Sequence, residues 1–231
     1  MSLAAPKLDA RLATAAEYVR GGRLADVGTD HAYLPVAMVI EGRSSDAVAS
    51  DVRQGPLERA RQTVEKYGAV GRVSLVLTDG LRGIESYTPD DIAIFGMGGE
   101  LIASIIEAAA WVRDPRVRLI LQPITRRAEL RRYLLSHGFG IEDETMSLAD
   151  GRIYQTICAA YTGHNAEYTP AEYELGRCNI HKGGQLYVRY LGQQCRHHAA
   201  ILGARGVDRS SDDPEAELLR QLEKLNGETN I

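Results

Sequence analysis

The residues whose types could bind a ligand or do chemistry gather in four short motifs, each of which follows a short apolar run. The four motifs are Asp26-Val27-Gly28-Thr29-Asp30-His31, Ser50-Asp51-Val52, Thr78-Asp79-Gly80-Leu81 and Gly96-Met97-Gly98-Gly99. If the apolar runs are strands of one parallel sheet, all four motifs lie beyond the carboxyl ends of the strands, where open α/β sheets bind their ligands. Their coincidence predicts one binding cleft.

The first motif predicts a glycine turn between a strand and a helix. Gly28 has no Cβ, so a ligand can approach its backbone, and the N-terminus of the next helix offers free N–H groups. Asp30 would repel the pyrophosphate of a nicotinamide dinucleotide, which binds at such a turn. S-adenosylmethionine has no phosphate, and its sulfonium and ammonium are compatible with the carboxylates of Asp26 and Asp30. The alternative is a strand-turn-helix in which Gly28 is purely structural.

The other three motifs suit the remaining parts of an adenosyl ligand. Asp51 follows the second strand at about the spacing at which an acidic residue accepts hydrogen bonds from ribose hydroxyls; its alternative role is a helix cap. Asp79 could accept a hydrogen bond from an adenine amino group while Leu81 packs on the ring, or the motif is a plain Asp-Gly turn. The glycines of 96–99 would let a flat base approach the ligand, or they form only a flexible loop.

The predicted elements before Gly163 define the fold class. Strands are predicted at 23–27, 47–51, 73–77, 92–95, 118–122, 139–145 and 153–161, and helices at 8–19, 34–40, 56–67, 101–110 and 128–136. Strands that alternate with helices imply right-handed crossovers and a mostly parallel sheet. The segment 146–152 is too short for a crossover helix, so the last two strands are expected to pair antiparallel at one edge. We therefore expect an α/β fold with a seven-stranded, mostly parallel sheet.

The character of the sequence changes after Gly163, where strand-like runs disappear. Apolar residues at loose helical spacing over 173–203, a polar break over 206–214 and a leucine stripe over 215–225 predict an antiparallel helical hairpin. The hairpin is either a packing appendage or a substrate-docking arm. We expect two domains, 1–162 and 163–231.

Composition limits the classes of protein. The chain has 231 residues, 44% hydrophobic and 25% charged, as in ordinary globular proteins. No apolar run is long enough to span a bilayer and the N-terminus has no apolar signal segment, which favours the cytoplasm and no membrane partner. Three widely spaced cysteines and the lack of a zinc-like His/Cys cluster indicate reduced thiols and no metal. The net charge of −4 argues weakly against nucleic acid, but the arginine-rich segments 111–132 and 171–206 could hold a polyanion.

Several stretches in the first 160 or so residues follow the pattern of one known family. They are the run 26–35, Ser50-Asp51-Val52 with Gly55-Pro56, Asp79-Gly80-Leu81, Gly96-Met97-Gly98-Gly99, Leu121-Gln122-Pro123 and the opening Leu8-Asp9-Ala10-Arg11-Leu12. On these motifs the sequence resembles the bacterial tRNA (adenine(22)-N1)-methyltransferase family. The resemblance implies a class I Rossmann-like methyltransferase fold, S-adenosyl-L-methionine as methyl donor, and N1 of adenine 22 in the D-arm region of tRNA as acceptor. It also implies a C-terminal helical hairpin, whose first helix here contains an unusual Gly183-Gly184 pair.

Within that function we expect Asp30 to be the catalytic residue, because a carboxylate near the methionine end would stabilise the positive charge that develops on the methylated base. The expected cofactor-binding residues are Asp26, Gly28, Thr29, Asp30, His31, Tyr33, Leu34, Asp51, Val52, Asp79, Gly80, Leu81, Gly96, Met97 and Gly98. The expected substrate-binding residues are Arg11, Gly98, Gly99, Gln122, Pro123 and Arg126. Arg11 and the basic segments would contact tRNA phosphates. No metal is expected, and a monomer is favoured.

Three other functions stay open from the residues alone. A methyltransferase acting on another RNA, a protein or a small molecule would share the same cofactor motifs; the sequence lacks the Asn/Asp-Pro-Pro-Tyr motif of enzymes that methylate exocyclic amines of DNA. A non-catalytic RNA-binding protein that senses S-adenosylmethionine would share these motifs too. A nucleotide-dependent oxidoreductase is disfavoured by Asp30 in the glycine turn.

Overall fold

The structure is a computed structural model of the chain that describes residues 4–229. Contacts between residues divide the chain into two compact units, Met1–Ala166 and Glu167–Ile231. The first unit holds the sheet, and the described part of the second, 167–229, contains helices and no strand.

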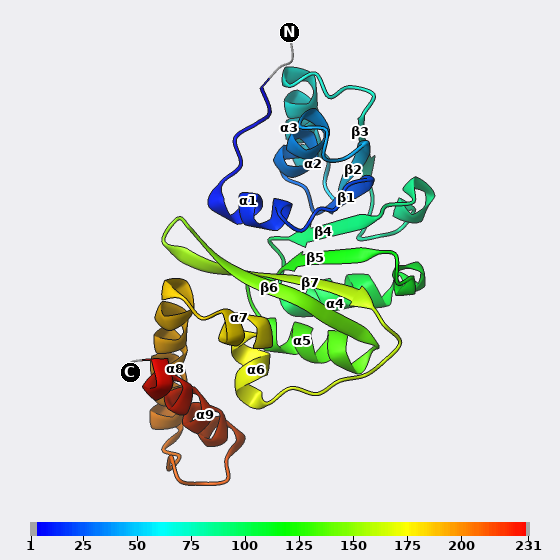
Figure 1. The fold of residues 1–231 in the computed structure, drawn as a ribbon. Helices are drawn as coiled ribbons and strands as arrows, with labels where there is room; N and C mark the ends of the chain where they lie inside the picture. Colours follow the sequence, from blue (N-terminus) through cyan, green and yellow to red (C-terminus); the bar gives the residue numbers. More distant parts are fainter. Residues whose placement is uncertain (1–3, 230–231) are drawn as a thin grey trace. The chain divides into compact units, whose positions relative to one another are not determined.

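One sheet organises the first unit, with the strand order β3-β2-β1-β4-β5-β7-β6 (Figure 1). The strands are β1 Arg23–Val27, β2 Asp46–Asp51, β3 Val73–Leu77, β4 Asp91–Phe95, β5 Arg118–Gln122, β6 Phe139–Ala149 and β7 Arg152–Tyr161. Neighbouring strands among β1 to β5 are parallel, whereas β7 runs antiparallel to both β5 and β6. The predicted seven-stranded, mostly parallel sheet with an antiparallel pair at one edge is confirmed.

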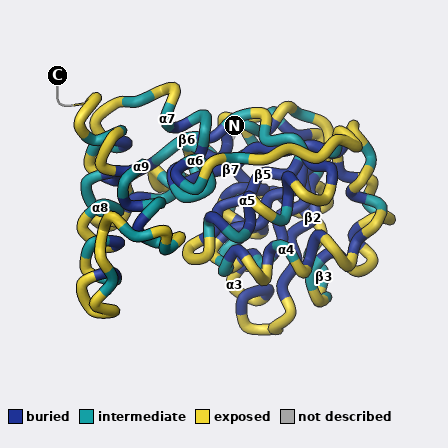
Figure 2. The backbone as a smooth tube through the Cα atoms, turned by 90° about the horizontal axis from the view of Figure 1, so that it is seen from below, coloured by how far each residue is buried: buried dark blue, intermediate teal, exposed yellow. Residues whose placement is uncertain are grey.

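Helices cover both faces of this sheet, because successive side chains of a buried strand point to opposite faces. In β4, Ile92 and Ile94 belong to the core cluster that includes α4 and α5, while Ala93 and Phe95 belong to the cluster that includes α1, α2 and α3. The elements are α1 Ala10–Ala16, α2 Tyr33–Ile40, α3 Gln54–Lys66, α4 Gly99–Glu107, α5 Arg127–Ser136 and the 3-10 helices η1 Ile84–Tyr87 and η2 Ala110–Arg113. Figure 2 shows the central strands as a buried layer.

The antiparallel edge differs from its predicted form at the turn. β6 continues to Ala149 and β7 begins at Arg152, so the loop predicted over 146–152 is reduced to two residues. Asp150 and Gly151 have φ values of +47° and +74°, as a tight two-residue hairpin turn requires.

The second unit contains the helices α6 Pro170–Leu175, α7 Arg177–Lys182, α8 Gln185–Arg205 and α9 Pro214–Thr229. The single helix predicted over 173–203 is therefore divided into three, at glycines whose positive φ values do not fit a helix. These values are +87° at Gly176, +61° at Gly183 and +92° at Gly184. The predicted helical hairpin is formed by α8 and α9, which pack through Leu202, Ala216 and Leu219.

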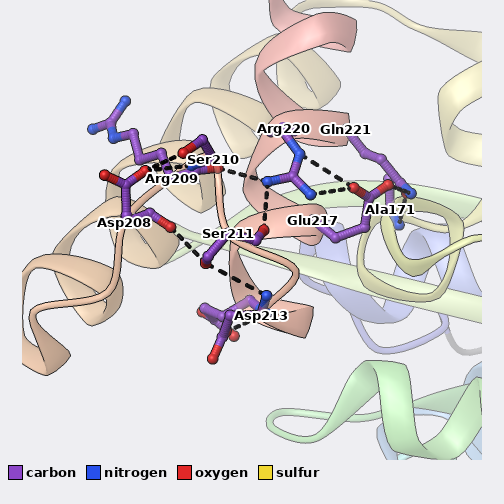
Figure 3. A network of polar contacts seen from close by, with 10 residues as sticks. Ala171, Asp208, Arg209, Ser210, Ser211, Asp213, Glu217, Arg220 and Gln221 are labelled. Atoms are coloured by element: carbon purple, nitrogen blue, oxygen red, sulfur yellow. Dashed lines mark hydrogen bonds and ion pairs between the residues drawn. The ribbon is translucent and has the colours of Figure 1, made fainter.

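The loop between α8 and α9 is held by a polar network (Figure 3). The Arg220 guanidinium on α9 donates hydrogen bonds of 2.6 and 2.9 Å to the backbone oxygens of Arg209 and Ser211, and one of 2.7 Å to the Glu217 carboxylate. The Asp208 carboxylate accepts hydrogen bonds from the backbone N–H and the hydroxyl of Ser210. These contacts fix the loop against the first turns of α9.

Between residues 4 and 229, no helix is long and apolar enough to cross a membrane. Over the same residues, no three His, Cys, Asp or Glu side chains are grouped in a way that could hold a metal ion.

Candidate functional site

A cavity of about 590 Å³ opens where the chain order of the sheet reverses, beyond the carboxyl ends of β1 and β4. Open α/β sheets bind ligands at such a switch point. Its walls come from the β1–α2 turn, the ends of β2 and β4, and the helices α1 and α3. The lining residues are Asp9, Arg11, Leu12, Asp26, Gly28, Thr29, Asp30, His31, Ala32, Tyr33, Leu34, Asp51, Arg53, Arg59, Phe95, Gly96 and Met97.

The glycine turn after β1 is shaped by its backbone. The N–H groups of Gly28 and Thr29 both donate to the backbone oxygen of Ser50, at 2.8 and 2.9 Å, which ties the turn to β2. Gly28 has φ +78°, and a Cβ there would collide with the Met97 methyl group. The Thr29 hydroxyl accepts a 3.0 Å hydrogen bond from the N–H of Ala32, just before α2. A side chain at position 28 would therefore strain the turn and narrow the cavity.

Asp26 is a buried carboxylate of the cavity, with 8% of its surface exposed. Burial raises its pKa from 3.8 to about 6, against a hydrogen bond from Thr29 and the positive charge of Arg11, which both lower it. Burial disfavours a charged carboxylate unless a cation lies nearby. A cationic ligand group at this position would offset the cost of keeping Asp26 ionised.

Asp51 lies at the end of β2 and is 8% exposed. Its Oδ1 atom accepts a 2.8 Å hydrogen bond from the backbone N–H of Arg53, and the Arg53 guanidinium lies 3.6 Å from the same oxygen. Asp51 lines the cavity. This geometry leaves Oδ2 available to hydroxyl groups, as a ribose site requires.

Asp30 stands at the mouth of the cavity in contact with two neighbours. The Arg59 guanidinium on α3 donates to Oδ1 from Nε at 3.0 Å and also from Nη2. His31 Nε2 lies 3.5 Å from Oδ2, and the His31 ring is stacked on Tyr33 with centroids 5.2 Å apart. The sequence motifs located Asp30, His31 and Tyr33, but they did not reveal Arg59.

Two loops that follow β4 and β5 are joined by backbone hydrogen bonds. Ile124 N–H donates to the oxygen of Met97 at 2.9 Å, and Gly99 N–H donates to the oxygen of Thr125 at 2.8 Å. A Cβ on Gly99 would collide with the backbone oxygen of Arg126. The close approach explains why glycine stands there. Of the residues expected here, Gly96 and Met97 line the cavity, whereas Gly98, Gly99, Pro123 and Arg126 do not.

Some other expected residues lie outside this cavity as well. Asp79, Gly80 and Leu81 line a second cavity of about 410 Å³, which they share with residues of α4 such as Ile105. Val52 is 62% exposed and lines neither cavity. The structure thus brings together the residues expected at the methionine and ribose of the ligand, whereas the residues expected at its adenine line a separate cavity.

Gln122, at the end of β5, was expected to bind the substrate, and its position in the structure does not agree with that role. Its side chain has no exposed surface, so direct contact with a substrate does not agree with its burial. Gln122 Oε1 accepts a 3.1 Å hydrogen bond from Arg11 Nη1, and its Nε2 donates to Thr156 Oγ1 at 2.9 Å and to the Arg11 oxygen at 3.3 Å. Gln122 therefore connects α1 to the sheet.

The strand order and a carboxylate-lined glycine turn at the switch point define a Rossmann-like methyltransferase domain. A family model described as a methyltransferase domain matches residues 8–157. The chain is 39% identical over 163 residues to the tRNA (adenine(22)-N(1))-methyltransferase of Bacillus subtilis. The matched segment covers 70% of this chain and 68% of the relative. The chain belongs to the tRNA (adenine(22)-N(1))-methyltransferase family.

Solved structures agree with this assignment over nearly the whole chain. The crystal structure of the B. subtilis M1A22 tRNA methyltransferase superposes with a TM-score of 0.80 at 31% identity, over 96% of this chain and 98% of that one. A Streptococcus pneumoniae protein in complex with S-adenosyl-L-methionine has a TM-score of 0.84 at 28% identity, over 95% and 100% of the two chains. The fold of both units therefore follows the relatives.

Proposed function

We propose that the protein is an S-adenosylmethionine-dependent methyltransferase that modifies N1 of adenine 22 in tRNA. The observation that carries the proposal is the grouping of Asp26, Asp30 and Asp51 around the Gly28 turn in one cavity. These three carboxylates suit a cationic ligand with ribose hydroxyls and disfavour a pyrophosphate at the same place. The target adenine is taken from the name of the B. subtilis relative.

The residues present fit the cofactor by three features of the cavity. The left-handed backbone of Gly28 leaves room that a Cβ would fill. Buried Asp26 offers a carboxylate to an ammonium group, and Asp51 offers one to the ribose. When bound, S-adenosylmethionine supplies a methyl group made electrophilic by its sulfonium.

The protein's own part in the reaction is mainly alignment. Adenine N1 has an in-plane lone pair and is itself the nucleophile, so no strong base is needed before transfer. Holding the base in line with the methyl group converts an encounter between two molecules into an intramolecular one. The base becomes cationic as it is methylated, and the Asp30 carboxylate at the cavity mouth stabilises that charge. Extrusion of the base from its stack costs roughly a few kcal/mol, which contacts with the RNA backbone must offset.

The experiment is an incubation of the full-length protein with methyl-labelled S-adenosylmethionine and bulk tRNA. We expect label in tRNA and a reverse-transcription stop at one adenine in the D-arm, because N1 methylation blocks base pairing. Label that appears in protein or in a small molecule, and not in tRNA, would show that tRNA is not the substrate. Cofactor binding without transfer to any acceptor would identify a sensor, and no binding would remove the cofactor as well.

We further propose a division of labour between residues 1–162, which bind the cofactor and hold the reacting groups, and residues 163–231, which dock the tRNA. Exposed Arg189 and Arg196 on α8 support a docking role, since basic side chains neutralise phosphates. We also propose that the protein is a monomer and works in the cytoplasm. The three cysteines of the chain, none of which forms a disulfide, fit a reducing compartment.

A further inference from the structure

Large apolar side chains are exposed mainly at the carboxyl end of the sheet. Among the described residues, seven large hydrophobic side chains are exposed, and five of them end or follow the parallel strands β1 to β5, one for each strand. These five are Tyr33, Val52, Leu77, Leu101 and Ile124. A single exposed apolar residue is ordinary on a protein surface, but a row of them where the sheet binds its ligands indicates contact with apolar parts of a ligand.

The order of the strands divides this row into two sides. Asp51 on β2 and Asp26 on β1 are proposed to hold the cofactor, whereas β4 and β5 follow β1 on its other side. The space over β4 and β5 is therefore left for the base that receives the methyl group. Of the two exposed apolar residues on that side, Leu101 lines the separate cavity of about 410 Å³. Ile124 is the other.

The loop that carries Ile124 is fixed beside the cavity. Ile124 N–H donates to the oxygen of Met97 at 2.9 Å, and Met97 lines the cavity. Arg126, two residues further on, has φ +54° and ψ +45°, a left-handed conformation that residues other than glycine rarely adopt. Backbone strain of this kind gathers at binding sites, where the surrounding structure maintains it. Ile124 thus stands on a fixed backbone, and 45% of its surface is exposed.

The part of the site next to Ile124 carries few side chains. Gly96 lines the cavity, and a Cβ there would meet no atom within 4 Å. Gly98 pairs with Thr125 in a parallel bridge between the two loops. An open stretch of glycine backbone beside an apolar side chain fits a flat, uncharged ring.

We propose that Ile124 forms an apolar wall of the acceptor site and packs on the adenine that is extruded from the tRNA. The proposal rests on the proposed function, because it names a contact of the acceptor in the same reaction. An extruded base loses its stacking neighbours, and apolar side chains in the pocket replace them. Packing on Ile124 holds the ring so that N1 faces the methyl group, and such alignment is the main source of rate in a transfer that needs no strong base.

The test separates placement of the base from docking of the tRNA. Full-length wild type and Ile124→Ser are compared by steady-state methylation of tRNA, by filter binding of tRNA and by calorimetry with S-adenosylmethionine. We expect kcat to fall by roughly tenfold or more in Ile124→Ser, because a misplaced base reacts slowly. The dissociation constants of tRNA and of the cofactor are expected to change little. Ile124→Leu, which keeps an apolar side chain of the same size, is expected to retain most of kcat.

A fluorescent base reports the same contact without turnover. In a tRNA with 2-aminopurine in place of adenine 22, fluorescence rises when the base leaves its stack. We expect wild type saturated with S-adenosylhomocysteine to raise the fluorescence on binding this tRNA, and Ile124→Ser to give a smaller rise at saturating protein.

Val70→Ser is the matched control, since Val70 is 68% exposed but precedes β3 at the amino end of the sheet. It is expected to have the constants of wild type. Thermal melting checks that each variant folds, and Ile124→Thr, which keeps the branched shape, is the second variant. A wild-type kcat in folded Ile124→Ser and Ile124→Thr would overturn the inference, as would a loss confined to cofactor binding or to tRNA binding. Failure of the wild type to methylate tRNA would instead refute the proposed function.

Discussion

Arg59 on α3 donates hydrogen bonds to a single oxygen of Asp30, Oδ1, from both Nε and Nη2. Asp30 is 64% exposed at its side chain, so without this partner it could adopt other rotamers. The pair joins the glycine turn to a helix that begins after the next strand. Arg59 therefore acts as a positioning residue for the carboxylate that the proposed mechanism uses.

The first prediction concerns the turnover of Asp30 and Arg59 variants. Asp30→Asn is expected to lower kcat by roughly 100-fold or more, because one preorganised electrostatic group is commonly worth that much in a transition state. Cofactor binding is expected to change little. Arg59→Gln is expected to lower kcat by a smaller factor, with the KM for tRNA unchanged. Steady-state methylation of tRNA measures both constants.

The double variant Asp30→Asn/Arg59→Gln distinguishes positioning from a separate role. If Arg59 acts only through Asp30, the double variant turns over no more slowly than Asp30→Asn, since the two effects are not additive. A raised KM in Arg59→Gln, together with additive losses in the double variant, would show that Arg59 binds tRNA directly.

The second prediction follows from the raised pKa of Asp26. Because folding raises this pKa from 3.8 to about 6, the folded protein binds the proton more tightly than the unfolded chain does. The group's contribution to the free energy of unfolding therefore falls as the pH rises from about 4 to about 6, and it is lowest at neutral pH. Asp26→Asn is expected to raise the free energy of unfolding without ligand by up to roughly 2 kcal/mol at neutral pH, and by less near pH 4.

Urea unfolding of Asp26→Asn and wild type at two pH values tests this. A difference between the two proteins that is the same at about pH 4.5 and at about pH 7.5 would contradict a raised pKa. Calorimetry is expected to show weaker binding of S-adenosylmethionine by Asp26→Asn, and weaker binding by wild type below pH 6, where Asp26 is protonated. Stability gained at the expense of binding is the usual mark of a functional charge.

The third prediction concerns the glycine turn. Gly28→Ala places a side chain at φ +78° and against Met97, so the turn must strain or Met97 must move into the cavity. We expect a loss of roughly 1 kcal/mol in the free energy of unfolding, from the left-handed strain, and at least about tenfold weaker cofactor binding. Gly203→Ala in α8 is the control: its Cβ meets open space, and alanine is expected to stabilise the helix by up to about 1 kcal/mol. Equal cofactor affinities in Gly28→Ala and wild type would remove this turn from the site.

Much of the fold could be predicted because the buried strands are short apolar runs whose ends carry glycine and aspartate. Asp26, Gly28 and Asp51 were found in this way, and they line one cavity. Arg59 was missed because its partner lies 29 positions away, and no local pattern encodes a contact between a turn and a helix that begins only after the next strand.

The Arg11–Gln122 contact spans 111 positions, so the sequence did not reveal that the Arg11 side chain lies against the end of β5. Its burial depends on where α1 packs, and a seven-residue helix without a strong pattern does not reveal its neighbours. In the second unit, the glycines at 176, 183 and 184 were visible in the sequence, but their positive φ values were not. Their division of one helix into three is a property of backbone conformation that apolar spacing does not report.

The last prediction concerns the fully buried ion pair of Arg131 on α5 and Glu144 on β6. Arg131 Nε donates to Glu144 Oε1 at 2.6 Å, Nη2 donates to Gln155 Oε1, and neither charged side chain has exposed surface. Arg131→Met is expected to lower the free energy of unfolding by about 3–5 kcal/mol, because it leaves a buried carboxylate without its cation. The double variant Arg131→Met/Glu144→Leu is expected to regain most of that loss, since desolvation of both charges is then avoided. Urea unfolding of Arg131→Met, Glu144→Leu and the double variant measures the coupling energy between the two residues. Purely additive losses would show that the pair is not energetically linked.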